Sequence, residues 1–116
     1  MKLESLTPIL YSKDVAKSIA YYTEVLGFTG KWVWDHAVSF GKVYNDCMEI
    51  FFCKEAQGNP GTWLFIFVDN VDEYYEIIKA KGAMINSAPE NMPWGVREML
   101  VEDPDGHKIR FGQSVE

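Results

Sequence analysis

The sequence predicts an α+β fold built from two βαβββ modules that repeat along one chain. Two observations support this prediction: the order of strand, Asp or Asn cap, helix and glycine occurs twice, and further β-like stretches follow each copy. The two helical segments, Val15 to Gly27 and Val71 to Gly82, are nearly equal in length. We therefore expect one pseudo-symmetric domain over residues 1–116, with modules at about 5–54 and about 61–113.

The first module begins with an apolar run, Leu6 to Tyr11, that predicts a strand. Asp14 then stands where a helix cap is expected, and Gly27 provides the stop. Between them, apolar residues recur at helical spacing. Three short β-like stretches follow, at residues 29–35, 37–45 and 46–53.

The second module repeats this order after a polar Gly/Pro linker, Lys54 to Gly61. The stretch "TWLFIFV" predicts a strand, and Asn70 with Glu73 forms a capping box before the helix. We expect the buried face of this helix to consist of Val71, Tyr74, Ile77 and Ile78.

A long loop rich in Asn, Ser and Pro is predicted between this helix and Trp94. Two strands complete the module, Val96 to Val101 and His107 to Phe111. Pro104-Asp105-Gly106 between them suits a type I turn with glycine in the left-handed position, so we expect a hairpin.

Composition and charge exclude several classes of function. The net charge of −6 argues against nucleic acid as a partner, because a phosphate backbone requires a basic surface. No stretch has the length or apolarity of a membrane span or a signal peptide, so we expect a cytoplasmic protein with no membrane partner. Cys47 and Cys53 lie about 20 Å apart if they share one strand, which predicts free thiols.

Alternation along the predicted strands separates an aliphatic face from a mixed one. Trp63, Phe65 and Phe67 share one face of their strand, whereas Leu64 and Ile66 share the other. The same alternation places Glu49 with Phe51, and Lys108 with Arg110. Helices should cover the aliphatic faces. The mixed faces suit the wall of a ligand cleft better than a second packed core, although alternation alone leaves both possible.

The segments "PILYSKDVAKSIAYYTEVLGF", "FVDNVDEYYEIIKAKGA" and "PWGVREMLVEDPDGHKIRFG" resemble the glyoxalase/bleomycin-resistance/extradiol-dioxygenase superfamily, also called vicinal oxygen chelate proteins. The resemblance extends from Leu6 to Gln113. The "PWGVRE" loop is most similar to bleomycin-resistance binding proteins. That resemblance implies a homodimer with paired clefts, each lined by residues of both chains.

Enzymes of this superfamily hold a divalent metal with four side chains, which correspond here to Thr7, Glu49, Trp63 and Arg110. Only Glu49 is a ligand of the expected kind, and a guanidinium at the fourth position would repel a cation. We therefore predict no metal and no cofactor. Three roles stay open for Glu49 and Arg110: an ion pair across the dimer, a polar clamp on the ligand, or Glu49 as a general base.

The predicted function is binding and sequestering of a small planar aromatic compound, with a bleomycin-type antibiotic as one candidate and antibiotic resistance as its consequence. A lyase, isomerase or dioxygenase-like enzyme of the same superfamily is the alternative, and an interaction protein whose aromatic residues serve only dimerisation is a third. His36 is expected to be solvated and His107 structural. The predicted ligand-binding residues are Trp32, Trp34, Glu49, Phe51, Trp63, Phe65, Trp94 and Arg110.

Overall fold

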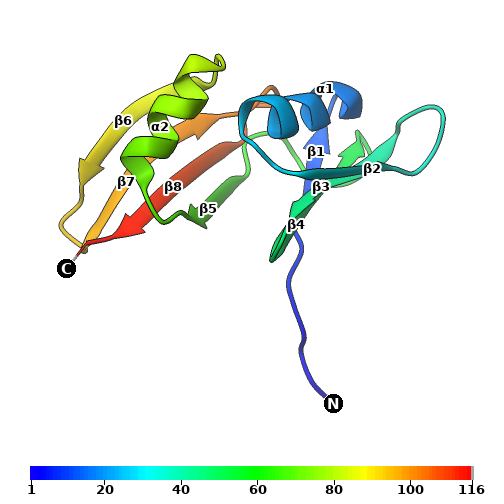
Figure 1. Ribbon diagram of the computed structural model, residues 1–116. Coiled ribbons are helices and arrows are strands. Elements are labelled where there is room, and N and C mark those ends of the chain that lie inside the picture. The colour runs from blue at the N-terminus through cyan, green and yellow to red at the C-terminus, as the bar shows by residue number, and fades with distance from the viewer. Residues whose placement is uncertain (116) are drawn as a thin grey trace.

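The computed structural model describes residues 1–115 and contains two four-stranded sheets (Figure 1). The first sheet consists of β1 (Ile9–Ser12), β2 (Gly30–Val33), β3 (Phe40–Asn45) and β4 (Met48–Lys54). The second sheet consists of β5 (Trp63–Phe67), β6 (Met84–Asn91), β7 (Val96–Glu102) and β8 (Lys108–Ser114).

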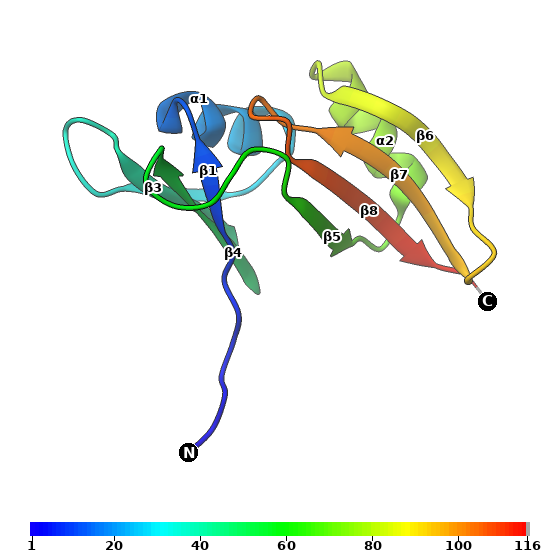
Figure 2. The same cartoon turned by 180° about the vertical axis from the view of Figure 1, so that it is seen from behind.

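The two sheets have equivalent topology. Their strand orders are β1-β4-β3-β2 and β5-β8-β7-β6, so each strand has a counterpart in the other module. The pairs β1–β4 and β5–β8 are parallel, and the remaining neighbours are antiparallel. The sheets lie side by side in both views rather than stacked face to face (Figures 1 and 2). The predicted α+β fold of two βαβββ modules is confirmed.

Capping side chains begin both helices, as predicted. Asp14 Oδ1 accepts a hydrogen bond from the Lys17 amide at 3.1 Å, at the start of α1 (Val15–Ala20). The chain then continues through a π-helical segment, η1 (Tyr21–Val25). Asn70 Oδ1 accepts from the Glu73 amide at 3.1 Å, at the start of α2 (Val71–Ala80). These bonds satisfy amides that have no partner within the helix.

One core joins the helices to the aliphatic faces of both sheets. Alternating apolar residues on the aliphatic faces are buried there, including Ile50 and Phe52 on β4 and Ile109 and Phe111 on β8. Helix α1 contacts β3 and β4, whereas α2 contacts β6, β7 and β8. Each sheet therefore has one face covered by its own helix and one face without a helix (Figure 1).

The structure corrects three predictions. Residues 84–91 form β6 instead of a loop; β6 is an edge strand with two register shifts, which tolerates Pro89 and hides the usual alternation. Ile77 is 47% exposed, because it lies to one side of the helical face formed by Val71, Tyr74 and Ile78. The first strand begins at Ile9 rather than Leu6.

No helix within residues 1–115 combines the length and apolarity needed to cross a lipid bilayer. Cys47 and Cys53 are both free thiols, the first exposed and the second buried, as predicted.

Candidate functional site

The face of the first sheet that carries no helix combines aromatic and charged side chains. Register places Tyr44 opposite Glu49, Phe51 opposite Lys42, and Lys42 opposite Trp32. We call these five residues the first-sheet face. An open depression of about 390 Å³ on this face is lined by Lys31, Trp32, Lys42, Tyr44 and Phe51. Lys42 and Tyr44 were missed from the sequence, although alternation with the buried Val43 would have placed them here.

Glu49 has two partners on this face. The Thr7 hydroxyl donates to Glu49 Oε1 at 3.3 Å, and Lys42 Nζ donates to Oε2 at 3.1 Å. Lys42 Nζ also lies 5.5 Å from the centre of the Tyr44 ring and 5.7 Å from that of Phe51. The Lys42 ammonium thus balances the carboxylate, and Glu49 would have to lose this partner to act as a general base.

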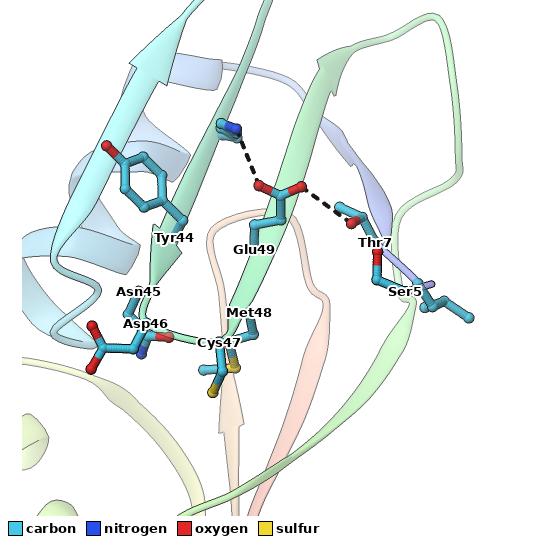
Figure 3. Close-up of a pocket in the computed structure, with 10 residues that line it drawn as sticks. Ser5, Thr7, Tyr44, Asn45, Asp46, Cys47, Met48 and Glu49 are labelled. Atoms are coloured by element: carbon cyan, nitrogen blue, oxygen red, sulfur yellow. Dashed lines mark hydrogen bonds and ion pairs between the residues drawn. The ribbon is translucent and has the colours of Figure 1, made fainter. Parts of the chain in front are cut away.

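A second hollow of about 320 Å³ lies beside Glu49, at the end of the β3–β4 hairpin. Figure 3 shows Thr7 and Ser5 on one side of Glu49, and Asp46 and Cys47 at the hairpin end. Polar side chains supply much of its lining. This hollow is therefore a more polar extension of the first-sheet face.

The helix-free face of the second sheet exposes more aromatic surface. Trp63, Phe65 and Phe67 on β5 are 56%, 43% and 65% exposed, and Trp94 in the turn before β7 is 64% exposed. We call these four residues, together with Glu98 on β7 and Arg110 on β8, the second-sheet face. Predicted alternation along β5 is confirmed, because Ile66, on the other side, is buried.

Glu98 organises the charged part of this face and was missed from the sequence. Its carboxylate is 1% exposed, and Oε1 accepts a hydrogen bond from Arg110 Nη1 at 2.9 Å. Trp94 Nε1 donates to Oε2 at 3.2 Å. The Arg110 guanidinium lies 5.5 Å from the centre of the Trp63 ring. Alternation with the buried Met99 would have placed Glu98 on this face.

The four residues at the superfamily's metal-ligand positions form two contacting pairs in different sheets. Thr7, just before β1, contacts Glu49 on β4 of the first sheet, and Arg110 contacts Trp63 in the second sheet. This set does not fit a divalent cation, since it offers one carboxylate and adds a guanidinium. Within residues 1–115 no group of three His, Cys, Asp or Glu side chains has a geometry that could hold a metal.

An ion pair between Glu49 and Arg110, one of the three roles left open by the sequence and expected across a dimer, is not formed within residues 1–115. Glu49 pairs with Lys42, and Arg110 pairs with Glu98. No hydrogen bond or ion pair between residues 1–115 joins the first-sheet face to the second-sheet face. Pairing across two chains stays a prediction. It would require Glu49 to exchange or share Lys42, and Arg110 to exchange or share Glu98.

Trp34 and His36 lie just beyond β2. Trp34 is 70% exposed, and its ring centre is 6.1 Å from that of Trp32. The two rings are tilted by 53°, so they do not form a flat stacking platform. His36 is exposed, as predicted.

Solved structures with this fold cover nearly the whole chain. A glyoxalase-related enzyme from Clostridium phytofermentans has 24% sequence identity and a TM-score of 0.85, with 99% of this chain and 98% of that chain covered. TioX from Micromonospora sp. ML1 has 20% identity and a TM-score of 0.83, with coverages of 97% and 99%. A bleomycin-binding protein complexed with bleomycin has 22% identity and a TM-score of 0.77, again with coverages of 97% and 99%.

These likenesses show the fold, while the family follows from the sequence itself. A search of curated proteins gave no significant match. A family model described as Glyoxalase/Bleomycin resistance protein/Dioxygenase superfamily matches residues 3–111. The match includes both modules and all eight strands at least in part, together with every predicted ligand-binding residue. The chain therefore belongs to the glyoxalase/bleomycin resistance protein/dioxygenase superfamily.

Proposed function

We propose that this protein binds a small planar aromatic compound without a metal ion. The observation that carries the proposal is the exposure of large aromatic side chains on the helix-free faces of both sheets, with Trp63, Phe67 and Trp94 each more than half exposed. Exposed apolar surface of this extent is unfavourable in water unless a ligand or partner covers it. Aromatic rings stack well on planar ligands.

We further propose that the binding cleft forms between two copies of the chain. Each face alone is an open surface, and the residues predicted to bind one ligand are divided between the two sheets. Apposition of the first-sheet face of one copy with the second-sheet face of another would enclose an aromatic cleft. A homodimer would also cover surface that the single chain leaves exposed.

A bleomycin-type antibiotic is the named candidate ligand. The support is the shared fold with a bleomycin-binding protein, together with a net charge of −6 that suits a cationic compound. Sequestration would require no bond to be made or broken. A cytoplasmic location, as expected from the sequence, is part of this proposal.

A tryptophan-fluorescence titration tests the proposal directly. Metal-free bleomycin is added to the wild-type protein, to Trp63→Ala and to Ile77→Ala, which removes an exposed apolar side chain from α2 instead. We expect saturable quenching with a dissociation constant of about 1 μM or lower in the wild type and in Ile77→Ala, and its loss in Trp63→Ala. A wild-type protein that does not respond would contradict the antibiotic assignment. Failure of a panel of planar aromatic compounds as well would contradict the proposed function.

A further inference from the structure

Two arginines of the second sheet hold their carboxylate partners in different ways. Arg97 donates from Nε to Asp72 Oδ2 and from Nη2 to Asp72 Oδ1, both at 2.9 Å, which is a closed two-bond fork. Arg110 donates to Glu98 from Nη1 alone, at 2.9 Å. In Arg97, the Nε and Nη2 groups, which form one edge of the guanidinium, both bind the carboxylate. In Arg110, the same two groups make no hydrogen bond with Glu98.

Trp94 explains the difference. Its indole Nε1 donates to Glu98 Oε2 at 3.2 Å, so this oxygen is directed to the indole rather than to the guanidinium. Glu98 thereby holds Arg110 by one oxygen. Within residues 1–115 the Arg110 side chain makes no other hydrogen bond, so its Nε and Nη2 groups keep three N–H donors for another acceptor.

This guanidinium edge lies within the aromatic part of the second-sheet face. The Arg110 side chain is 34% exposed, and its guanidinium is 5.5 Å from the centre of the Trp63 ring. The neighbouring cation, Lys108, is already engaged by Glu102 at 2.6 Å. Arg110 is thus the cation on this face whose Nε and Nη2 groups can bind a further acceptor and whose guanidinium lies beside an aromatic ring, that of Trp63.

We propose that Arg110 selects planar aromatic ligands that bear a carboxylate, which it would bind through the Nε–Nη2 edge while the ring of the ligand stacks beside Trp63. This inference rests on the proposed binding of a planar aromatic compound, and it favours an acidic ligand over the cationic antibiotic named above. Two parallel charge-assisted hydrogen bonds favour a carboxylate over a neutral amide. The Glu98 carboxylate repels the carboxylate of the ligand. The expected preference for a carboxylate over an amide is therefore about tenfold in affinity, at the low end of what two such hydrogen bonds supply.

The test compares 2-naphthoate with 2-naphthamide, which have the same ring system and differ in charge. Binding of each is measured by tryptophan quenching and by calorimetry with wild type, Arg110→Gln, and Arg97→Gln as the control. We expect the wild type and Arg97→Gln to bind naphthoate about tenfold more tightly than naphthamide, and Arg110→Gln to bind the two alike. Equal wild-type affinities, or binding of neither compound, would overturn the inference. The proposed function is contradicted only if bleomycin and the panel of planar aromatic compounds also fail to bind.

Two further variants distinguish the effect of two parallel hydrogen bonds from the effect of a positive charge alone. They also keep the inference testable if Arg110→Gln misfolds. Arg110→Lys keeps the charge but lacks the fork, so its preference for naphthoate should fall. Trp94→Phe keeps a ring but removes the N–H group, which releases Glu98 Oε2 to close the fork on Arg110. Its naphthoate affinity should drop to that of naphthamide, and an unchanged preference in Trp94→Phe would refute the assigned role of the indole.

Discussion

His107 Nε2 lies 2.8 Å from the carbonyl oxygen of Tyr11, although 96 positions separate the two residues in the sequence. The other ring nitrogen, Nδ1, accepts a hydrogen bond from the Thr62 amide at 2.9 Å. A neutral imidazole with its proton on Nε2 satisfies both contacts. Since Tyr11 lies on β1 and Thr62 precedes β5, this fully buried ring joins the two modules. The sequence predicted a structural role for His107, but not this connection between modules.

Replacing His107 by alanine should destabilise the protein by about 2–4 kcal/mol, because two half-buried backbone groups lose their partner and a cavity forms where the buried ring was. Urea denaturation followed by circular dichroism measures the loss. His36→Ala is the matched control, since His36 is exposed, and it should leave the midpoint nearly unchanged. Equal effects of the two substitutions would argue against the role assigned to His107.

Glu98 and Arg110 should show strong energetic coupling. Glu98 is 1% exposed, so Glu98→Gln leaves the guanidinium without its carboxylate, and a double-mutant cycle with Arg110→Gln should yield a coupling of about 1–3 kcal/mol. The cycle for the solvent-exposed pair Asp72 and Arg97 provides the comparison and should give a smaller value. Additive effects of the Glu98 and Arg110 substitutions would show that the pair contributes no mutual stabilisation.

The proposed dimer can be tested on β5. Phe67 is 65% exposed on the second-sheet face, and Phe67→Glu would place a charge in the apolar contact between copies. We expect the wild type to sediment as a dimer and Phe67→Glu as a folded monomer. Ile77→Glu, which adds the same charge on α2, should remain dimeric. A wild type that sediments as a monomer throughout a dilution series would contradict the dimer.

Alkaline pH should unfold the protein through its buried tyrosines. Burial, with Asp103 as the next cause, raises the pKa of Tyr22 well above 10.0, and burial is also the main cause of the raised pKa of Tyr74. A folded-state pKa above the unfolded one stabilises the protein below about pH 10, and this contribution is lost as the pH rises further. Absorbance at the phenolate band, recorded with circular dichroism, should therefore show that these tyrosines ionise only as the fold is lost.

Tyr22→Phe is the matched variant for this prediction. It removes a hydrogen bond from the Tyr22 hydroxyl to Asp103 Oδ2 at 2.8 Å, so stability at neutral pH should fall. The decline in stability above about pH 10 should become shallower, because one fewer ionisable group differs between the two states. Complete ionisation of all six tyrosines near pH 10 with a native circular-dichroism spectrum would contradict the assignment.

Local patterns carried most of the information about the fold. Asp14 and Asn70 cap the helices as predicted, because a capping bond involves residues only three positions apart. Alternation on β4 and β5 also separates the buried from the exposed face as predicted, since successive side chains of a strand point to opposite sides. Strand β6 was missed because edge pairing with bulges does not require a regular apolar pattern.

The sequence by itself determined the two-module fold, the aromatic character of the helix-free faces, and the absence of a suitable ligand set at the four metal positions. The first two follow from residue type and short-range periodicity, whereas the four positions are those that the superfamily resemblance implies. Only the tertiary structure decided the ion pairs: Glu49 meets Lys42 across β3 and β4, and Arg110 meets Glu98 across β7 and β8. Which charges meet depends on strand register and on side-chain reach, and neither can be deduced from the type of a residue or its position along the chain.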